Sequence, residues 1–393
     1  MKIKSLVIDG IGGIKHLELS FNDHINVICG ANGIGKTTIL DTISDPFCLG
    51  RASHLKRNAT CKQGKYSITI EVSDGTTKKN VSAEENVDSF SPNEIGYRTH
   101  LYKYARHLLS FGINRDINYV QLNSVAPDPQ RQDTDVASQA VNGIKANDIK
   151  NWFVNRYLFS EKKDSITNEQ MANYRLAESV FSILDDTIQF KTVNASTFDI
   201  ILETSKGNIY FEYLSSGYKS CIYVIFGIIK EIEYRTVGKP IMVQDFDGVI
   251  LIDEIDLHLH PVWQSELIKA LKAIFPCAQF ILTTHSPSIL QSLERDEIIA
   301  LGYNESGDTF LKELNLGRFG LQGWTLEEIL KDIMEMPSTS SQLYQDTLKS
   351  FDEAMNNEDK DLILQQYVLL KEMLHPNNPL RKLLSIQVAE WED

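Results

Sequence analysis

Residues 30–38 read GANGIGKTT and match the pattern G-x-x-x-x-G-K-[ST], which is typical of loops that bind the phosphates of a nucleotide. In such a loop backbone N–H groups surround the phosphates, and glycines let the backbone approach them closely. Lys36 is expected to reach the β- and γ-phosphates, and the Thr37 hydroxyl is expected to ligate Mg²⁺. The other expected phosphate contacts in this loop are Gly30, Asn32, Gly33, Gly35 and Thr38. The sequence therefore predicts a site for a nucleoside triphosphate with Mg²⁺.

Two acidic residues follow the apolar run at 248–252 and are the next candidates for chemistry. We expect Asp253 to hold Mg²⁺ through water and Glu254 to take the proton from the attacking water as a general base. Strands often end in solvated acids, so the pair alone does not identify a catalytic site. Downstream of a phosphate loop it predicts hydrolysis of the nucleotide.

The hydrophobic pattern predicts the elements that position these groups. Residues 25–29 form an apolar strand that leads into the phosphate loop, and residues 36–43 form the helix that leaves it. Further on, strands are expected at 198–203, 208–213, 248–252 and 279–283, and helices at 218–234 and 262–275. Strands with continuous apolar cores that alternate with helices indicate an α/β sheet covered on both faces.

Composition narrows the class of protein. The formal net charge of −14 over 393 residues argues against a body built mainly to coat nucleic acid, although a local basic patch stays possible. The five scattered cysteines suit reduced thiols. No secretory pattern opens the chain, and its longest apolar run, residues 221–229, is too short to span a membrane. We expect a cytoplasmic protein without a membrane role.

Residues 214–220 read LSSGYKS and lie at the junction between a predicted strand and a long predicted helix. On its own, Ser-Ser-Gly at this place could be an ordinary helix N-cap. Ahead of the acidic strand it resembles the Leu-Ser-Gly-Gly-Gln signature of the ABC-type ATPases, with Ser216 in place of a glycine and Tyr218 in place of the glutamine. The resemblance implies that the substrate is ATP, and that Ser215, Ser216 and Gly217 of one protomer close over the γ-phosphate bound by another.

The same resemblance implies a role at the nucleotide site for three further residues. His285, in the Thr-His-Ser-Pro that follows the strand at 279–283, looks like the family's switch histidine, which contacts the γ-phosphate. Asp256 resembles the residue of the loop that runs along the dimer interface. Gln121, at the end of a short predicted strand over 117–121, is the candidate for the glutamine that links Mg²⁺ to the inserted region.

Gly217 and Asp253 are 36 residues apart, a wide gap that resembles the RecF, SMC and OLD branch of the family, as does the Asp-Leu-His-Leu-His-Pro at 256–261. OLD proteins carry a Toprim nuclease with an Asp-x-Asp at the end of a strand. We expect none within this chain, because the Asp-Lys-Asp at 359–361 opens a predicted helix and no strand precedes it. The chain is similar to the ATPase subunits of Septu- and retron-type anti-phage systems, which pair with a separate HNH nuclease. Residues 148–153 and 323–328 are two of the stretches that resemble those subunits.

The resemblance thus implies an α/β fold, an ABC-type P-loop ATPase head with a mostly helical insertion and a helical C-terminal extension. We expect the head at 1–72 and 191–320, the insertion at 73–190 with a loop over 73–95, and an interaction tail at 321–393. The tail is expected to open with a capping box at 325–328 and to hold helices at 340–356 and 360–374.

The resemblance also implies a homodimer, or a higher homo-oligomer, formed through ATP, with an effector nuclease bound by the insertion or the C-terminal helices. A second reading is a DNA-binding repair or recombination ATPase like RecF and Rad50. A basic stretch (Lys56, Arg57, Lys62, Lys65) and the basic and aromatic segment 97–107 support DNA binding. The sequence also leaves open a scaffold that scarcely hydrolyses ATP and a transporter ATPase.

Overall fold

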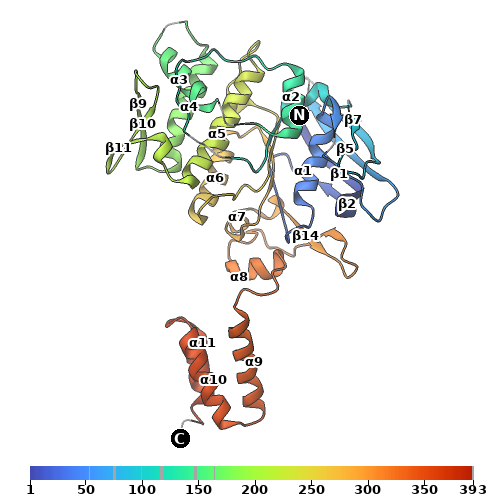
Figure 1. Ribbon diagram of the computed structural model, residues 1–393, viewed down its shortest axis with the longest axis vertical. Coiled ribbons are helices and arrows are strands. Elements are labelled where there is room, and N and C mark those ends of the chain that lie inside the picture. Colours follow the sequence, from blue (N-terminus) through green and yellow to red (C-terminus); the bar gives the residue numbers. More distant parts are fainter. Residues whose placement is uncertain are drawn as a thin grey trace. The chain divides into compact units, whose positions relative to one another are not determined.

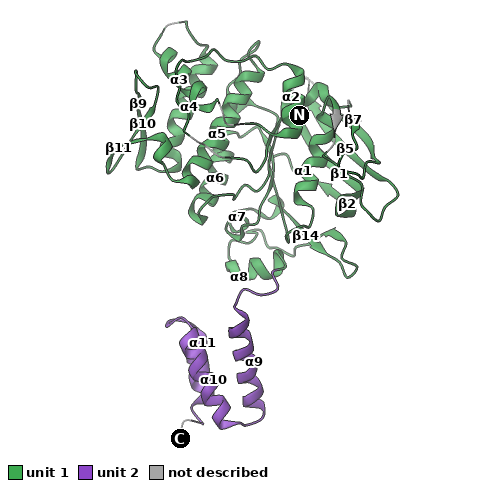
Figure 2. Cartoon of the chain, viewed as in Figure 1, with its two compact units in different colours: residues 1–335 green, residues 336–393 purple. Residues whose placement is uncertain are grey.

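A computed structural model describes residues 1–391 except 53, 74–76, 99, 116–118, 146–147 and 163. The chain forms two compact units, Met1–Glu335 and Met336–Asp393, coloured separately in Figure 2. The first unit contains the β-sheets that the structure describes, and the described part of the second is helical.

A six-stranded sheet forms the centre of the first unit, in the order β15-β14-β3-β13-β12-β8. Its strands are β3 (Ile25–Cys29), β8 (Leu108–Phe111), β12 (Val249–Ile252), β13 (Gln279–Thr283), β14 (Ile298–Tyr303) and β15 (Thr309–Leu311). The pairs from β14 to β8 are parallel, and β15 is antiparallel to β14. Because parallel strands end at one edge, the loops after β3, β8, β12 and β13 meet there.

Both faces of this sheet are covered, which explains its continuous apolar strands. In β12, Val249 and Leu251 face one core together with α1 (Lys36–Ser44) and the antiparallel sheet. Ile250 and Ile252 face a second core, formed with the helices on the other side. Figure 1 shows the two layers around the sheet, with β1, β2 and β5 on one side and α3 to α5 on the other.

The antiparallel sheet has the order β2-β1-β5-β6. Its strands are β1 (Lys2–Ile11), β2 (Ile14–Ser20), β5 (Gly64–Ser73) and β6 (Lys78–Val87); beside it β4 (Gly50–Ala52) pairs with β7 (Gly96–Arg98). The expectation of a loop over 73–95 is therefore wrong. Strand β6 is polar because it lies at the edge of the sheet, with one neighbour and most of its side chains in solvent.

The helical layer surrounds α5 (Ser216–Arg235), whose residues are almost all buried. Its other members are α3 (Ile149–Ser160), α4 (Asn168–Leu184), α6 (Pro261–Ile274) and a small antiparallel sheet of β9 (Ile188–Val193), β10 (Ile200–Thr204) and β11 (Gly207–Tyr210). Helix α2 (Asp133–Asn142) lies on the other side of the central sheet, where Val136 and Ala140 share a core with α1. Aromatic rings join the helices: Phe226 of α5 stacks on Phe153 of α3 at 5.4 Å and lies edge-on to Phe181 of α4 at 5.5 Å. This packing fixes the direction of α5.

The domain boundaries drawn by the structure differ from the expected ones. Strands β6 and β8 lie within 73–190, yet they belong to the sheets of the head, so the helical part of this range is not a separate body. Residues 321–335 belong to the first unit, because Leu321, Ile329 and Ile333 are buried in its core. The separate tail begins at residue 336.

The second unit contains α9 (Gln342–Asn356), α10 (Lys360–Met373) and α11 (Pro379–Val388) around a core that includes Phe351 and Leu370. The two helices expected at 340–356 and 360–374 agree with α9 and α10. The remaining short helices are η1 (Asp45–Phe47), η2 (Tyr102–His107), η3 (Phe211–Tyr213), η4 (Val243–Asp245), α7 (Pro287–Gln291), η5 (Arg295–Glu297), α8 (Leu326–Glu328) and the π-helical η6 (Ile329–Ile333). Among the described residues no helix combines the length and the apolar character needed to cross a membrane.

Candidate nucleotide-binding site

The phosphate loop joins the end of β3 to the start of α1 and has the backbone expected of it. Gly33 and Gly35 have φ values of 78° and 106°, a region that residues with a Cβ rarely adopt. The Lys36 side chain is buried over the loop, and its Nζ donates to the carbonyl oxygens of Gly30 and Ala31 at 2.9 Å. Burial lowers the pKa of Lys36. A buried ammonium beside the N-terminus of α1 favours an anion, so the loop fits a phosphate chain.

A direct contact joins this loop to the acidic strand. The Thr37 hydroxyl donates to a carboxylate oxygen of Asp253 at 3.0 Å, and the Thr283 hydroxyl donates to the other oxygen at 2.6 Å. The start of α1 thereby meets the carboxyl ends of β12 and β13. A hydroxyl and a carboxylate oxygen are ligands that Mg²⁺ prefers, usually alongside water and phosphate oxygens. Thr37 and Asp253 therefore fit the cofactor that the sequence predicts.

Glu254 lies in a tight turn immediately after β12. Its φ of 47° is in the left-handed region, where a residue other than glycine costs about 1–2 kcal/mol. The Glu254 N–H donates to the Thr283 hydroxyl at 2.7 Å, and the Ile255 N–H donates to the Thr283 carbonyl at 2.9 Å. One hydroxyl thus orients Asp253 and Glu254 together. Backbone strain that surrounding contacts enforce is typical of functional sites.

Asp256 and His285 are linked at the same edge. One carboxylate oxygen of Asp256 accepts from the Thr284 hydroxyl at 2.6 Å and from the His285 N–H at 3.1 Å. Asp256 therefore holds the histidine loop, and its contact with a nucleotide stays a prediction. Burial, followed by the nearby Lys36 ammonium, lowers the pKa of His285, which favours the neutral imidazole at neutral pH.

The signature-like residues cap α5. Ser215 is the N-cap residue, and its hydroxyl accepts from the Tyr218 N–H at 3.3 Å. Ser215 and Ser216 are exposed, whereas Gly217 is buried against the loop that follows the acids. A Cβ on Gly217 would lie 3.3 Å from the His258 carbonyl oxygen. The structure thus places the two serines on the surface and the glycine at a close backbone contact.

Tyr218, which stands where the family signature has glutamine, faces the core. Its side chain is buried, its hydroxyl donates to the Phe181 carbonyl at 2.6 Å, and its ring lies edge-on to Trp263 at 5.3 Å. The tyrosine therefore anchors the start of α5 to α4 and leaves the surface at Ser215 and Ser216 free of its bulk.

Replacing Tyr218 with phenylalanine is expected to lower the free energy of unfolding by about 1 kcal/mol, because one buried hydrogen bond is lost while the ring packing stays. ATP turnover should stay within about two-fold of the unmodified chain, since the hydroxyl points away from the surface. Urea unfolding and phosphate release measure the two quantities. A large loss of turnover at unchanged stability would show that Tyr218 acts in the reaction.

The expectation that Gln121 ends a strand of the sheet is wrong. Residues 119–121 form no strand, residues 117 and 118 lie outside the described part, and Gln121 is exposed. The strand beside β12 is β8, and its last residue, Phe111, accepts the Asp253 N–H at 3.0 Å. The chain that leaves β8 at 112–115 is therefore the segment next to the acids. The buried run Leu-Leu-Ser-Phe before Gly112 was the sequence signal for it.

Several cations of the basic stretch already have partners. Lys65 pairs with Glu84 at 3.1 Å, and the Arg57 guanidinium donates to the Cys61 carbonyl at 2.8 Å and lies over the Phe90 ring. In the other segment, Arg106 pairs with Asp133 at 2.8 Å. These contacts give part of the basic stretch partners within the chain, and DNA binding stays a prediction.

Known protein families and relatives that match this chain include ATPases, as a nucleotide site would require. The family described as AAA domain, putative AbiEii toxin, Type IV TA system matches residues 79–291, and the AAA ATPase domain family matches residues 1–106. The chain is 44% identical over 396 residues to the Septu protein PtuA of Bacillus thuringiensis, which covers 99% of this chain and 98% of the relative. The chain belongs to the Septu PtuA family. The resemblance to the ATPase subunits of Septu-type systems is thereby confirmed, and the α/β fold with a helical extension agrees with it.

Another sequence relative and a solved structure align with a smaller share of this PtuA-family chain. It is 31% identical over 146 residues to the Retron Vc95 probable ATPase of Vibrio cholerae, with coverage of 37% of this chain and 27% of the relative. A solved SMC head bound to the C-winged helix domain of ScpA is 18% identical, with a TM-score of 0.49 over 80% of this chain and 98% of that one.

Proposed function

We propose that the chain is an ATP-hydrolysing switch of anti-phage defence that dimerises around ATP and controls a separate HNH-type effector nuclease. The observation that carries the proposal is the 3.0 Å contact between the Thr37 hydroxyl and the Asp253 carboxylate. It joins the phosphate loop and the acidic turn into one site, with Glu254 beside it. The full-length likeness to a Septu protein supports the role in defence.

In this proposal each residue has a defined task in hydrolysis. Lys36 and the N–H groups at the start of α1 bind the phosphates, and Thr37 and Asp253 hold Mg²⁺, which would offset negative charge on the phosphate oxygens. Glu254 accepts the proton of the attacking water. His285, kept neutral and held by Asp256 through its backbone, orients groups at the γ-phosphate.

The dimer in this proposal forms because one protomer alone leaves the γ-phosphate partly uncovered. Ser215 and Ser216 are exposed at the N-terminus of a 20-residue helix, where backbone N–H groups and the helix dipole favour an anion. We place this surface against the nucleotide of a second copy. ATP then binds the closed dimer better than open protomers, and only such a difference in affinity can shift the equilibrium between them.

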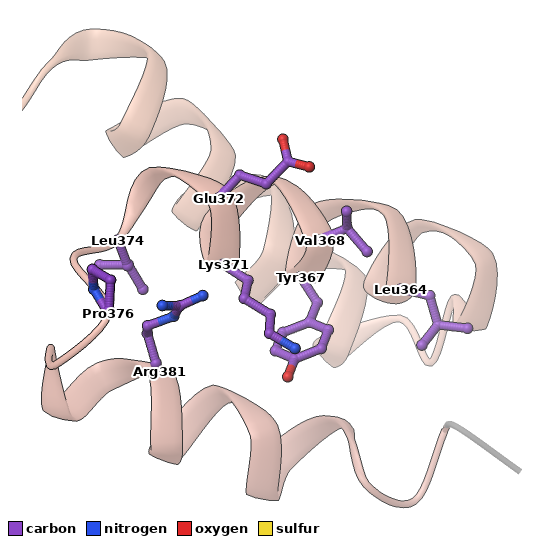
Figure 3. A pocket seen from close by; sticks show the side chains of 8 residues that line it. All are labelled: Leu364, Tyr367, Val368, Lys371, Glu372, Leu374, Pro376 and Arg381. Carbon is purple, nitrogen blue, oxygen red and sulfur yellow. The ribbon is translucent and has the colours of Figure 1, made fainter.

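The helical second unit is our candidate for docking the nuclease. Figure 3 shows its groove between α10 and α11, with Leu364, Tyr367 and Val368 on one side and Arg381 on the other. The groove has a volume of about 590 Å³ and combines an apolar wall with cations. Helices α3 and α4 of the first unit are the alternative docking site. The proposal places the assembly in the cytoplasm, and DNA reaches it through the nuclease.

The test is capture of the tagged full-length chain from its native cell, followed by mass spectrometry and a DNA-cleavage assay on the same eluate. A stoichiometric nuclease is expected, and removing residues 336–393 should abolish its capture while ATP turnover stays within about two-fold, because the first unit has its own core. DNA recovered without a protein companion would favour a repair ATPase.

Point variants refine this test on the intact chain. Val368 is 53% exposed at the groove, and Leu343 on α9 is 66% exposed. Val368→Asp is expected to reduce nuclease capture at least about ten-fold, because a charge in an apolar contact is costly, and Leu343→Asp serves as its control. Capture that survives both the deletion and Val368→Asp would assign docking to α3 and α4.

A further inference from the structure

Arg115 lies in the segment that leaves β8 and has no role in the site described so far. Its side chain is 3% exposed. The guanidinium donates to three backbone carbonyls: Nε to Gly112 at 3.3 Å, Nη1 to Ile255 at 3.5 Å, and Nη2 to Asp253. Two of these carbonyls belong to the residues on either side of Glu254.

The contacts of Arg115 complete the support of a strained turn. Glu254 has a φ of 47°, and the Thr283 hydroxyl accepts its N–H from one side. Arg115 binds the carbonyls of Asp253 and Ile255, the residues before and after Glu254. The planar guanidinium presents its N–H groups in a fixed fork, which the flexible ammonium of lysine cannot reproduce. Together these contacts restrain the backbone at Glu254 and on both sides of it.

The segment that carries Arg115 is itself held by the signature helix. The Tyr223 hydroxyl of α5 donates to the Ile144 carbonyl at 2.9 Å and lies 3.4 Å from the Asn114 carbonyl, next to Arg115. Burial lowers the pKa of Arg115, and the neighbouring acids Asp253 and Asp256 counteract that shift. A guanidinium stays charged in proteins, so a fixed positive charge faces the acidic turn.

We propose that Arg115 is a positioning residue for ATP hydrolysis, fixing the turn at residues 253–255 so that the Glu254 carboxylate faces the attacking water. The inference rests on the proposed ATPase function and adds to it the residue that aims the general base. Arg115 acts through Glu254 and not by contact with the nucleotide. Its loss should therefore slow the chemical step and leave ATP affinity unchanged.

Arg115→Lys tests this with Arg235→Lys as the matched control. Arg235 is also buried and donates to backbone carbonyls, those of Ala105 and Leu108, but at the opposite end of β8. For Arg115→Lys we expect kcat to fall at least about ten-fold, because misplacing a reacting group by about 1 Å can cost as much as 10²-fold, with KM and the Kd for ATP within about two-fold. Arg235→Lys should lower the thermal midpoint with kcat unchanged.

A double variant separates positioning from general stability. In a Glu254→Gln background Arg115→Lys should cause no further loss of single-turnover rate with radiolabelled ATP, because two residues that act as a unit are not additive. An equal loss of kcat in Arg235→Lys, a parallel change of Kd, or a full additional loss in the double variant would each overturn the inference. Should Arg115→Lys fail to fold, Arg115→Gln is compared with Arg235→Gln in the same way.

The same measurement distinguishes the role of Arg115 from the proposed function. An unmodified chain that releases no phosphate would overturn the proposed function, and the role of Arg115 with it. Turnover by the unmodified chain together with an unchanged kcat in Arg115→Lys would overturn the role of Arg115 alone.

Discussion

Replacing Glu254 with glutamine is expected to lower ATP turnover by about 10²–10⁴-fold, the usual contribution of a general base. Glutamine keeps the shape of the side chain but cannot accept the proton of the attacking water. The turn around it should persist, because its hydrogen bonds are made by backbone atoms. ATP binding should be kept, so the variant should accumulate in the state that ATP favours.

In the proposed function that state is a closed dimer, so light scattering of Glu254→Gln should give twice the protomer mass with ATP and Mg²⁺ and the protomer mass without them. Glu266→Gln on α6 is a suitable control, because Glu266 is partly exposed and pairs with Lys269, three residues further along the same helix. It should behave as the unmodified chain does. The same protomer mass with and without ATP in Glu254→Gln would rule out dimerisation around the nucleotide.

Replacing Ser215 with aspartate is expected to reduce turnover at least about 100-fold while leaving the fold intact. Aspartate caps a helix as well as serine does, so α5 should still begin at Ser216. It also places a negative charge on the surface proposed to meet the triphosphate of the partner. A like-charge contact costs several kcal/mol, and each 1.4 kcal/mol is about ten-fold in affinity.

Ser215→Asn is the matched control, because asparagine caps equally well and has almost the size of aspartate without its charge. Its turnover should exceed that of Ser215→Asp at least about ten-fold, and the Kd of both variants for ATP at low protein concentration should equal that of the unmodified chain. Phosphate release measured across protein concentrations separates the two steps. Equal activity of the aspartate and asparagine variants would remove Ser215 from the nucleotide contact.

The sequence predicts this site well where a long motif lies next to a buried apolar run. The phosphate loop, β12 and β13 lie where residues 25–38, 248–254 and 279–285 predict them. In these segments residue type and local structure agree, because a parallel strand buried on both faces is apolar throughout. The sequence alone therefore predicted that Asp253 and Thr37 lie at the same Mg²⁺ site.

Other parts depended on contacts that residue type does not reveal. β8 is only four residues long and follows directly on the short helix η2, so its pattern is ambiguous between helix and strand. Gln121 was expected to link Mg²⁺ because it is a glutamine at the end of a predicted strand over 117–121, and the described residues 119–121 form no strand. The tail boundary was misplaced for a related reason, because the capping box at Thr325 opens a helix that packs on the head.

The position of β3 in the central sheet has a consequence for the order in which the protein is made. Both neighbours of β3 come late: β13 begins at Gln279 and β14 at Ile298, roughly 250 residues after β3 ends. A ribosome adding about 5–20 residues per second needs about 10–50 s to reach them. The antiparallel sheet, by contrast, is complete once residue 87 has emerged. The nucleotide site is therefore among the last parts of the first unit to assemble, so under the proposed function a nascent chain could not yet dimerise around ATP.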